Sequence, residues 1–246
     1  MIQVVVPTMR PPADIPAICA ALRAPPERAI FIHNTPESNL GVLGSLQRGY
    51  ELTTAPVIAY LHDDVTIHDD GWLDRVSAEF ADPMVGIVGF GGALRHGLLD
   101  IYKTPYRLAQ LGRDGFLSNM DDAEVHGERF NGVCDVAVVD GFAIGVRRRL
   151  LAECGGWPVD RFPAHHNYDY LACCLAHRYH YRVRLVGVRC NHAGGSTATS
   201  PAYQEWASRT RWGSDAEMHR IGHQLIYDEF VDVLPWACAH PNGGRR

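Results

Sequence analysis

Short, almost wholly apolar runs separated by amphipathic stretches constrain the fold of this chain more than any other feature. The runs are rich in Val and Ile and do not alternate apolar with polar residues, so both of their faces are expected to be buried. Such strands, joined through helices, form a parallel sheet covered on both faces. The sequence therefore predicts an α/β fold. Strand patterns lie at residues 2–6, 29–32, 57–61, 85–90, 136–139 and 182–188, and helical patterns at residues 14–22, 40–52 and 215–233.

The size and charge of the chain narrow the classes of protein that it can represent. Its 246 residues, 46% of them hydrophobic, can build one large core, and no linker-like segment divides them. The net charge of −5 gives no general attraction to nucleic acid or to an anionic membrane. Residues 91–132 show no period that assigns them to helix or strand. The oligomeric state is not readable from the sequence.

The compartment is predicted from apolar runs and cysteines. No run reaches the roughly 18 residues that a transmembrane helix needs, and the N-terminus lacks a signal-peptide pattern. The seven cysteines are odd in number and never spaced as Cys-x-x-Cys, so we expect them to be reduced. A soluble cytoplasmic protein is predicted.

Two Asp-Asp pairs stand close together in the stretch AYLHDDVTIHDDGWLDRV. Asp69-Asp70 precedes an amphipathic helical pattern, so Asp70 is expected to cap that helix and Asp69 to face its positive end. Asp63-Asp64 instead follows a buried strand, at the edge where parallel sheets bind ligands. Two adjacent carboxylates there indicate either a divalent metal site or a solvated loop.

Six segments occur in an order that resembles a known family. They are VVVPTMR, FIHNTPESN, YLHDDV, GFAIGVRRRLLAECGGWP, HNYDYLACCLAHRYHYRV and CNHAGGS. Together they resemble the inverting "family two" glycosyltransferases of the GT-A fold, which use nucleotide sugars. The resemblance covers about residues 1–200 and implies a GT-A domain there, with residues 201–246 as a helical extension packed on it.

The resemblance implies a metal site. Asp64 holds the place of the last acid of the family's Asp-x-Asp motif, which coordinates Mn²⁺ or Mg²⁺, and His192 holds the place of a late metal-binding His. Imidazole suits Mn²⁺ better than Mg²⁺, which favours manganese. His62 replaces the motif's first acid, which leaves open a contact with ribose, an indirect contact with the metal, or neither. Asp63 is a further candidate for the donor site.

The resemblance also implies a catalytic base. Asp169 aligns with the Asp of the family's Glu-Asp pair, which takes the proton of the acceptor hydroxyl. A structural interpretation is compatible with this role, because Asn167 can cap a helix and an acid in its first turn is stabilised there. Tyr168 replaces the usual Glu.

The nucleotide site is implied by four positions near the first two strands. Pro7 and Thr8 match the family's Pro-Thr, whereas His33-Asn34 stands where an acid normally binds the nucleobase of the donor. Arg48 resembles an arginine near the diphosphate, and a surface arginine is the alternative. UDP is the first choice of donor nucleotide, with dTDP and GDP also open.

The sugar and acceptor sites are implied by the middle of the chain. Asp140 and Gly141 match the segment beside the donor sugar and acceptor. Trp157 matches a position where the family has an aromatic ring that forms the floor of the acceptor site. The alternative is that Trp157 packs in the core. The acceptor hydroxyl could belong to a polysaccharide, a lipid-linked sugar, a protein or a modified nucleobase. A non-catalytic nucleotide-sugar binding protein of the same fold is the alternative function.

Overall fold

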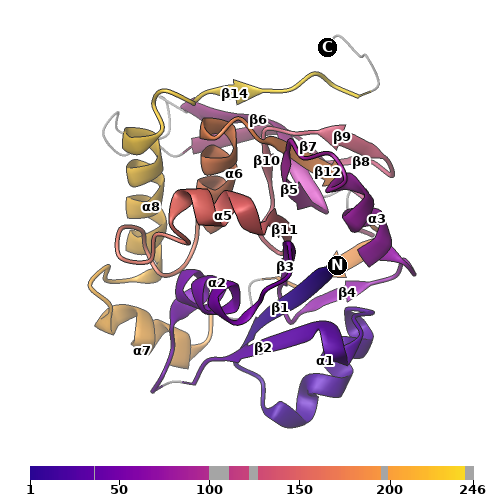
Figure 1. The fold of residues 1–246 in the computed structure, drawn as a ribbon. Coiled ribbons are helices and arrows are strands. Elements are labelled where there is room, and N and C mark those ends of the chain that lie inside the picture. The colour runs from indigo at the N-terminus through magenta and orange to yellow at the C-terminus, as the bar shows by residue number, and fades with distance from the viewer. Residues whose placement is uncertain (36, 100–110, 122–126, 195–198, 242–246) are drawn as a thin grey trace.

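A mixed sheet crosses the centre of the molecule (Figure 1). The computed structural model describes residues 1–35, 37–99, 111–121, 127–194 and 199–241. Within these residues, seven strands form the sheet; β9 and β11 run antiparallel to their neighbours, and the other strands run in one direction. In spatial order the strands are β2 (Ala29–His33), β1 (Ile2–Thr8), β3 (Val57–Leu61), β11 (Ala143–Arg147), β5 (Val85–Gly89), β12 (Arg182–Val186) and β9 (Val133–Asp135).

Helices cover both faces of this sheet, as the continuous apolar strands predict. One face carries Val5 and Ile58, and α2, α5, α6 and α8 pack in the same hydrophobic cluster. The other face carries Val4 and Val6, which share a cluster with α1 and α3. The α/β layering expected from the sequence is confirmed. The helices are α1 (Ile15–Ala21), α2 (Gly41–Leu52), α3 (Trp72–Glu79), α5 (Arg148–Cys154) and α6 (Tyr168–Arg178), followed by α7 (Pro201–Arg209) and α8 (Asp215–Glu229); short 3₁₀ helices span Pro12–Asp14 and Pro26–Arg28.

Two smaller sheets lie beside the main one. The stretch 91–132, which the sequence left unassigned, supplies most of the second sheet. The third joins β4 to β13 antiparallel and pairs Val65 with His192, which brings the residues after β3 next to a segment more than a hundred positions later. The strands of these sheets are β6 (Gly91–Leu99), β7 (Leu111–Ser118), β8 (Glu128–Arg129), β10 (Val138–Val139) and β14 (Trp236–Ala237), and then β4 (Val65–Ile67) and β13 (Cys190–His192).

The strand expected at residues 136–139 is the largest departure from the predicted order. Only Val138 and Val139 are paired, and they belong to the second sheet, opposite β6. The cause is β11, which runs antiparallel between β3 and β5 and takes the hydrogen-bonding edges of both. The place between β3 and β5 is therefore filled by β11 and not by residues 136–139.

The helix caps expected from Asp70 and Asn167 are not formed. Gly71, with φ of 69°, is the N-cap of α3, and no side chain caps that helix; Asp70 forms an ion pair with Arg23 instead. The left-handed turn at Gly71 puts the preceding side chain out of reach of the first-turn N–H groups. Asn167 is the N-cap residue of α6, but its φ of 57° likewise leaves its side chain without a capping hydrogen bond.

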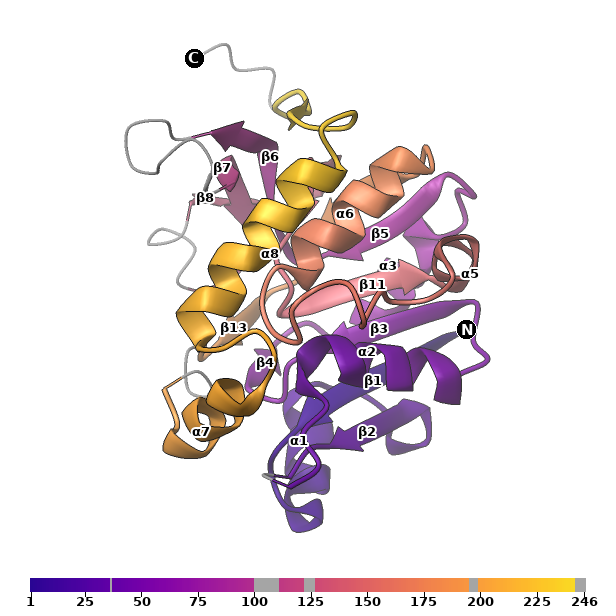
Figure 2. The same cartoon turned by 90° about the vertical axis from the view of Figure 1, so that its left-hand side faces the viewer.

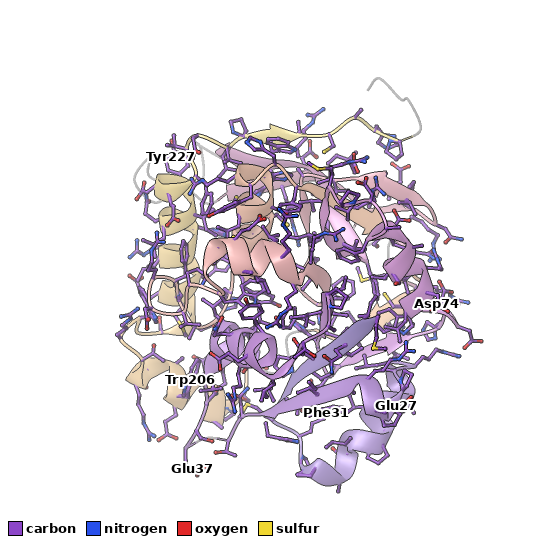
Figure 3. The ribbon with its side chains drawn as sticks, viewed as in Figure 1. Glu27, Phe31, Glu37, Asp74, Trp206 and Tyr227 are labelled. Atoms are coloured by element: carbon purple, nitrogen blue, oxygen red, sulfur yellow. The ribbon has the colours of Figure 1, made fainter. Side chains whose placement is uncertain are left out.

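Of the two C-terminal helices, α8 packs beside α6 (Figure 2), and α7 packs against α8. Ile226 and Phe230 belong to the same buried cluster as Leu171 of α6. Trp206 of α7, labelled in Figure 3, donates its indole N–H to the carbonyl of Asn39 at 3.1 Å. The division at residue 200 stays a prediction. Among the helices of the described residues, none is both long and apolar enough to cross a bilayer.

Candidate functional site

A pocket of about 570 Å³ opens where β1 and β3 end and α6 begins. Parallel strands present their carboxyl ends at one edge of a sheet, and the loops beyond these ends are free to carry polar side chains. The volume of the pocket is typical of a small-molecule binding site. Its wall includes Thr8, Asn34, His62, Asp63, Asp64, Arg113, Asp140, Asp169, His192 and, from the other side, His165, His166, Tyr203, Trp206 and His219.

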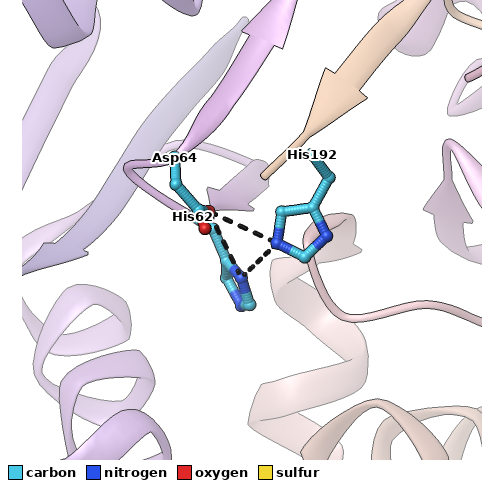
Figure 4. A group of neighbouring side chains, drawn as sticks. All are labelled: His62, Asp64 and His192. Atoms are coloured by element: carbon cyan, nitrogen blue, oxygen red, sulfur yellow. Dashed lines mark hydrogen bonds and ion pairs between the residues drawn. The ribbon is translucent and has the colours of Figure 1, made fainter. Parts of the chain in front are cut away.

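His62, Asp64 and His192, here called the His62 group, point toward one another in this pocket (Figure 4). His62 Nδ1 lies 3.2 Å from His192 Nε2, which lies 3.3 Å from Asp64 Oδ1. The separation of His62 Nδ1 from Asp64 Oδ1 is 4.0 Å. Ligands about 2.1 Å from one ion are separated by roughly 3 to 3.5 Å at neighbouring coordination positions. Two of the three separations match this range and the third is slightly longer, so a small movement of His62 or Asp64 would let the group hold a single divalent metal.

The electrostatics of Asp64 support this fit. Its Oδ1 is buried and accepts no hydrogen bond from the described residues, although His192 lies beside it, while its Oδ2 accepts the N–H of Gly194 at 3.0 Å. Burial alone would raise the pKa of Asp64, but His192, His62 and the Gly194 N–H outweigh it and lower that pKa. The carboxylate is therefore ionised and has an oxygen to offer a cation.

The surroundings of His62 hold its ring in place. Its Nε2 is 2.6 Å from the Tyr168 hydroxyl, and its backbone N–H donates to the carbonyl of Phe142 at 2.9 Å. The ring of Phe142 in turn stacks on His192, with centroids 5.0 Å apart. Burial, followed by the charge of His192, lowers the pKa of His62, which favours the neutral imidazole that binds metals.

Asp169 lies in the first turn of α6, on the wall of the same pocket. Its Oδ2 accepts the N–H of Gly141 at 3.2 Å, and its Oδ1 accepts that of Tyr170 at 2.9 Å. Burial, followed by the negative charge of Asp140, raises the pKa of Asp169 to about 7. A carboxyl group with such a pKa can accept a proton near neutral pH and release it again.

Arg113 is a site residue that sequence reasoning missed. It comes from β7, and its Nη1 donates to Asp140 Oδ2 at 3.0 Å. Its positive charge acts against the rise in the pKa of Asp169. No local pattern in residues 91–132 marks this arginine, because only the pairing of β7 with β6 brings it to the pocket.

The wall opposite the His62 group is rich in histidine and aromatic rings. His165 and His166 precede α6, Tyr203 comes from α7, and His219 from α8. Burial, followed by the charge of His166, lowers the pKa of His165 to about 3 and lowers that of His219. Sequence reasoning also missed this wall. The repeat of Asp215, His219 and His223 at four-residue spacing could have marked one face of the helix.

The structure brings most of the expected site residues together. Ten of them line the pocket: Pro7, Thr8, Asn34, His62, Asp63, Asp64, Asp140, Gly141, Asp169 and His192. Within this set, the Thr8 hydroxyl donates a hydrogen bond to Asp63. The side-chain N–H of Asn34 donates to Ser45 Oγ at 2.9 Å, and its Oδ1 accepts the N–H of Leu40 at 3.0 Å.

Three expected residues do not line the pocket. His33 is exposed at the end of β2, beside Phe31. Arg48 is exposed on α2 and pairs with Glu51 at 3.2 Å. Trp157 is 3% exposed and packs edge-on against Tyr60, so the core-packing alternative describes its position. Its indole N–H donates to the Tyr60 hydroxyl at 3.3 Å.

Comparison with known proteins gives structural likenesses only. No protein-family model matches the sequence, and neither does any curated protein. A197 from STIV has a TM-score of 0.49 at 13% identity, covering 79% of this chain and 86% of that one. The mannosyltransferase PcManGT from Pyrobaculum calidifontis, in complex with GDP-Man and Mn²⁺, has a TM-score of 0.49 at 14% identity, covering 92% and 69%.

The structure of GalNAc-T7 with UDP, GalNAc and Mn²⁺ has a TM-score of 0.54 at 10% identity. It covers 94% of this chain, which spans 55% of the length of GalNAc-T7. The mostly parallel central sheet with helices on both faces and this likeness confirm the expected GT-A type of α/β fold.

Proposed function

We propose that this chain is a metal-dependent glycosyltransferase that moves a sugar from a nucleotide-diphosphate sugar to an acceptor hydroxyl. The observation that carries the proposal is that one pocket holds both the His62 group and Asp169, whose raised pKa suits a base. Glycosyl transfer by single displacement needs these two things, charge neutralisation at the leaving diphosphate and a proton acceptor at the attacking hydroxyl. The fold shared with GalNAc-T7, which was solved with UDP, GalNAc and Mn²⁺, is consistent with it.

Asp169 is the proposed base. The N–H groups of Gly141 and Tyr170 fix its two oxygens, so its position is set before a substrate arrives. It takes the proton of the acceptor hydroxyl while that oxygen bonds to the anomeric carbon and the bond to the diphosphate breaks. Attack from the face opposite the leaving group inverts the anomeric centre, so we propose an inverting reaction of the family-two type.

His62, Asp64 and His192 are the proposed metal ligands. Two imidazoles and one carboxylate favour Mn²⁺ over Mg²⁺, which prefers oxygen alone. When bound, the ion would neutralise charge that develops on the leaving diphosphate. The backbone N–H of Gly194 and the Tyr168 hydroxyl hold two of the ligands in place.

The remaining pocket residues give the donor two further regions. Pro7, Thr8 and Asn34 are proposed to lie beside the nucleoside, with Asp63 held by Thr8. Asp140, held by Arg113, is proposed to accept a hydrogen bond from a hydroxyl of the donor sugar. Because His33 does not line the pocket, the discrimination of the base falls to these other groups. UDP-sugars are the first donors to test, followed by dTDP- and GDP-sugars.

A donor screen tests the proposal and separates it from a non-catalytic binding protein. UDP-, dTDP- and GDP-sugars are each offered with Mn²⁺, and both thermal stabilisation and release of the nucleotide diphosphate are measured. A glycosyltransferase hydrolyses its own donor slowly without an acceptor, and that turnover should be lost in Asp169→Asn. Stabilisation without any turnover, in water or with sugar, lipid-linked and peptide acceptors, would favour the binding protein.

A further inference from the structure

A second group of metal-type ligands lies on the opposite wall of the pocket. His165, His166 and Asp215, here called the His166 group, each place a nitrogen or carboxylate oxygen within 4.8 Å of the others. His166 Nε2 is 2.6 Å from Asp215 Oδ1, and the rings of His165 and His166 meet edge to face with centroids 4.4 Å apart. The Tyr203 hydroxyl donates to the same Asp215 oxygen. No part of the proposed transfer reaction uses these residues.

The backbone around the His166 group is fixed in an unusual conformation. His166 has φ of 66° and Asn167 has φ of 57°, two consecutive non-glycine residues in the left-handed region. Such conformations are uncommon for residues other than glycine and gather at functional sites. The loop is tied to α2, because the carbonyl of Ala164 accepts the N–H of Leu43 at 2.9 Å. The ligands are thus held in place by the fold rather than by one another alone.

Asp215 is positioned equally firmly. It is the first residue of α8, and the hydroxyl of Ser214 caps this helix by accepting the N–H of Glu217 at 3.3 Å. His219 follows one helical turn later on the same face, with its ring centroid 5.2 Å from that of His166. His219 thus lies beside the His166 group without being one of its three members.

The donor set identifies the chemical class of the ion. Two imidazole nitrogens and one carboxylate oxygen suit a transition metal such as Zn²⁺, whereas Mg²⁺ and Ca²⁺ prefer oxygen ligands. We propose that the His166 group binds a second divalent transition-metal ion, of the Zn²⁺ type, which joins the loop before α6 to the start of α8 and so fixes the C-terminal helices against the pocket. This site is separate from the His62 group and does not depend on the proposed transfer reaction.

A hydrogen-bonded network is the competing account of the same residues. In that account, Asp215 Oδ1 accepts the protons of His166 and Tyr203, and no ion is needed. The 2.6 Å between His166 Nε2 and Asp215 Oδ1 is a hydrogen-bond distance, so an ion that binds both atoms would move them to about 3 Å apart. The two accounts differ in what Asp215→Asn does. Asparagine keeps an oxygen acceptor for both hydrogen bonds but removes the negative charge that an ion requires. Tyr203→Phe does the reverse, because it removes one hydrogen bond and leaves all three ligands.

The experiment counts and locates metal ions on the chelator-stripped full chain. Zn²⁺ is titrated by calorimetry, Co²⁺ is titrated by its visible absorption, and bound metal is measured by elemental analysis. Asp64→Ala with His192→Ala disables the His62 group, and this background isolates the second site. On it, His166→Asn, Asp215→Asn and Tyr203→Phe are compared. His180→Asn is the matched control, since it removes an exposed imidazole at another left-handed position where asparagine is tolerated.

We expect the background protein to retain one Zn²⁺ and to gain melting temperature from it. His166→Asn and Asp215→Asn should each weaken that binding by more than about 100-fold, the upper end of what loss of a group outside the ligand sphere costs. Tyr203→Phe and His180→Asn should keep the ion and its thermal effect. The proposal is overturned if the background protein binds no Zn²⁺, or if His166→Asn and Asp215→Asn leave its affinity within tenfold of the parent. If the parent binds one more ion than the background protein, that additional ion belongs to the His62 group and leaves the count at the His166 group unchanged.

Discussion

Tyr168 and His62 are joined by a hydrogen bond of 2.6 Å between the Tyr168 hydroxyl and His62 Nε2. This bond links the first turn of α6, where Asp169 lies, to the end of β3, where the proposed metal ligands His62 and Asp64 lie. A metal ligand at His62 Nδ1 needs a free lone pair there, so the ring proton must sit on Nε2 and be donated to Tyr168. Tyr168, which stands where similar enzymes have Glu, thus sets the tautomer of a proposed ligand.

Tyr168→Phe should therefore weaken Mn²⁺ binding without unfolding the protein. Loss of a partner that orients a metal-bound histidine typically costs 10–100-fold in affinity, and we expect a fall of about that size. The measurement is a calorimetric titration of Mn²⁺ in the presence of UDP. Tyr179→Phe, an exposed tyrosine at the other end of α6, is the matched control. Equal affinities in the two variants would contradict this role of Tyr168.

Removal of the metal or of its carboxylate ligand should abolish transfer. We expect activity to disappear in excess chelator and to return with Mn²⁺, because the leaving diphosphate would otherwise develop its charge unneutralised. Asp64→Ala should lose Mn²⁺-dependent binding of nucleotide and still fold, since it removes the hydrogen bond from the Gly194 N–H but also a buried Oδ1 that accepts none from the described residues. Binding is followed by calorimetry and folding by circular dichroism. Undiminished transfer in excess chelator would rule out the metal requirement.

The sequence predicted the layers of the fold because its strands are continuous and apolar. It placed β3 at residues 57–61 and β1, β2 and β5 within two residues of their observed ends. It did not predict β11, and the antiparallel pairing of that strand with β3 and β5 is a tertiary property that no local pattern reveals. Residues 91–132 remained unassigned for the same reason, since the pairing of β6 and β7 is a tertiary property.

The sequence predicted the site residues that follow a recognisable strand, and it missed those that only tertiary packing brings to the pocket. Asp64 and His192 meet in the pocket because β4 pairs with β13 just beyond them. Arg113 and the His166 group reach it through elements that no local pattern ties to the sheet edge. Arg48 and Trp157 fit the resemblance in sequence, but their side chains point to solvent and to the core. Which face of an element is buried depends on neighbours that one segment does not reveal.

Arg113→Gln should move the pH profile of transfer. Arg113 lowers the pKa of Asp169 and holds Asp140 at 3.0 Å, so its removal should raise the pKa of Asp169 above about 7. A base with a higher pKa stays protonated to higher pH, so the acid limb of kcat/KM should shift upward. The control is Arg95→Gln, because Arg95 makes a similar but exposed pair with Asp114 on the same sheet. Superimposable pH profiles for the two variants would contradict the assignment.

Asp169 should also make stability depend on pH with a definite sign. Its folded pKa of about 7 is above its unfolded value, so the folded state binds its proton more tightly and stability falls as pH rises from about 4 to 7. Asp169→Asn removes this loss. Its melting temperature should exceed that of the parent at pH 8, and the difference should disappear near pH 4. A variant less stable than the parent at pH 8 would indicate that the carboxylate has a structural role.

The same substitution decides whether Asp169 is the base. Asparagine keeps the size of the side chain and an oxygen to accept the N–H groups of Gly141 and Tyr170, but it cannot take a proton at neutral pH. Transfer should fall by roughly two to four orders of magnitude, while donor and Mn²⁺ binding remain. Asp140 is the carboxylate that acts on the pKa of Asp169, and Arg113 pairs with it, so it offers a poor substitute base.

The stereochemistry of the product provides an independent readout. Single displacement with a base on the far face of the sugar gives a product whose anomeric configuration is opposite to that of the donor, which coupling constants in the product report. A retained configuration would require a different mechanism even if Asp169→Asn were inactive. A fully active Asp169→Asn would require a different base even if the configuration were inverted. Inversion together with a slow, well-folded Asp169→Asn is the result that the geometry of this pocket predicts.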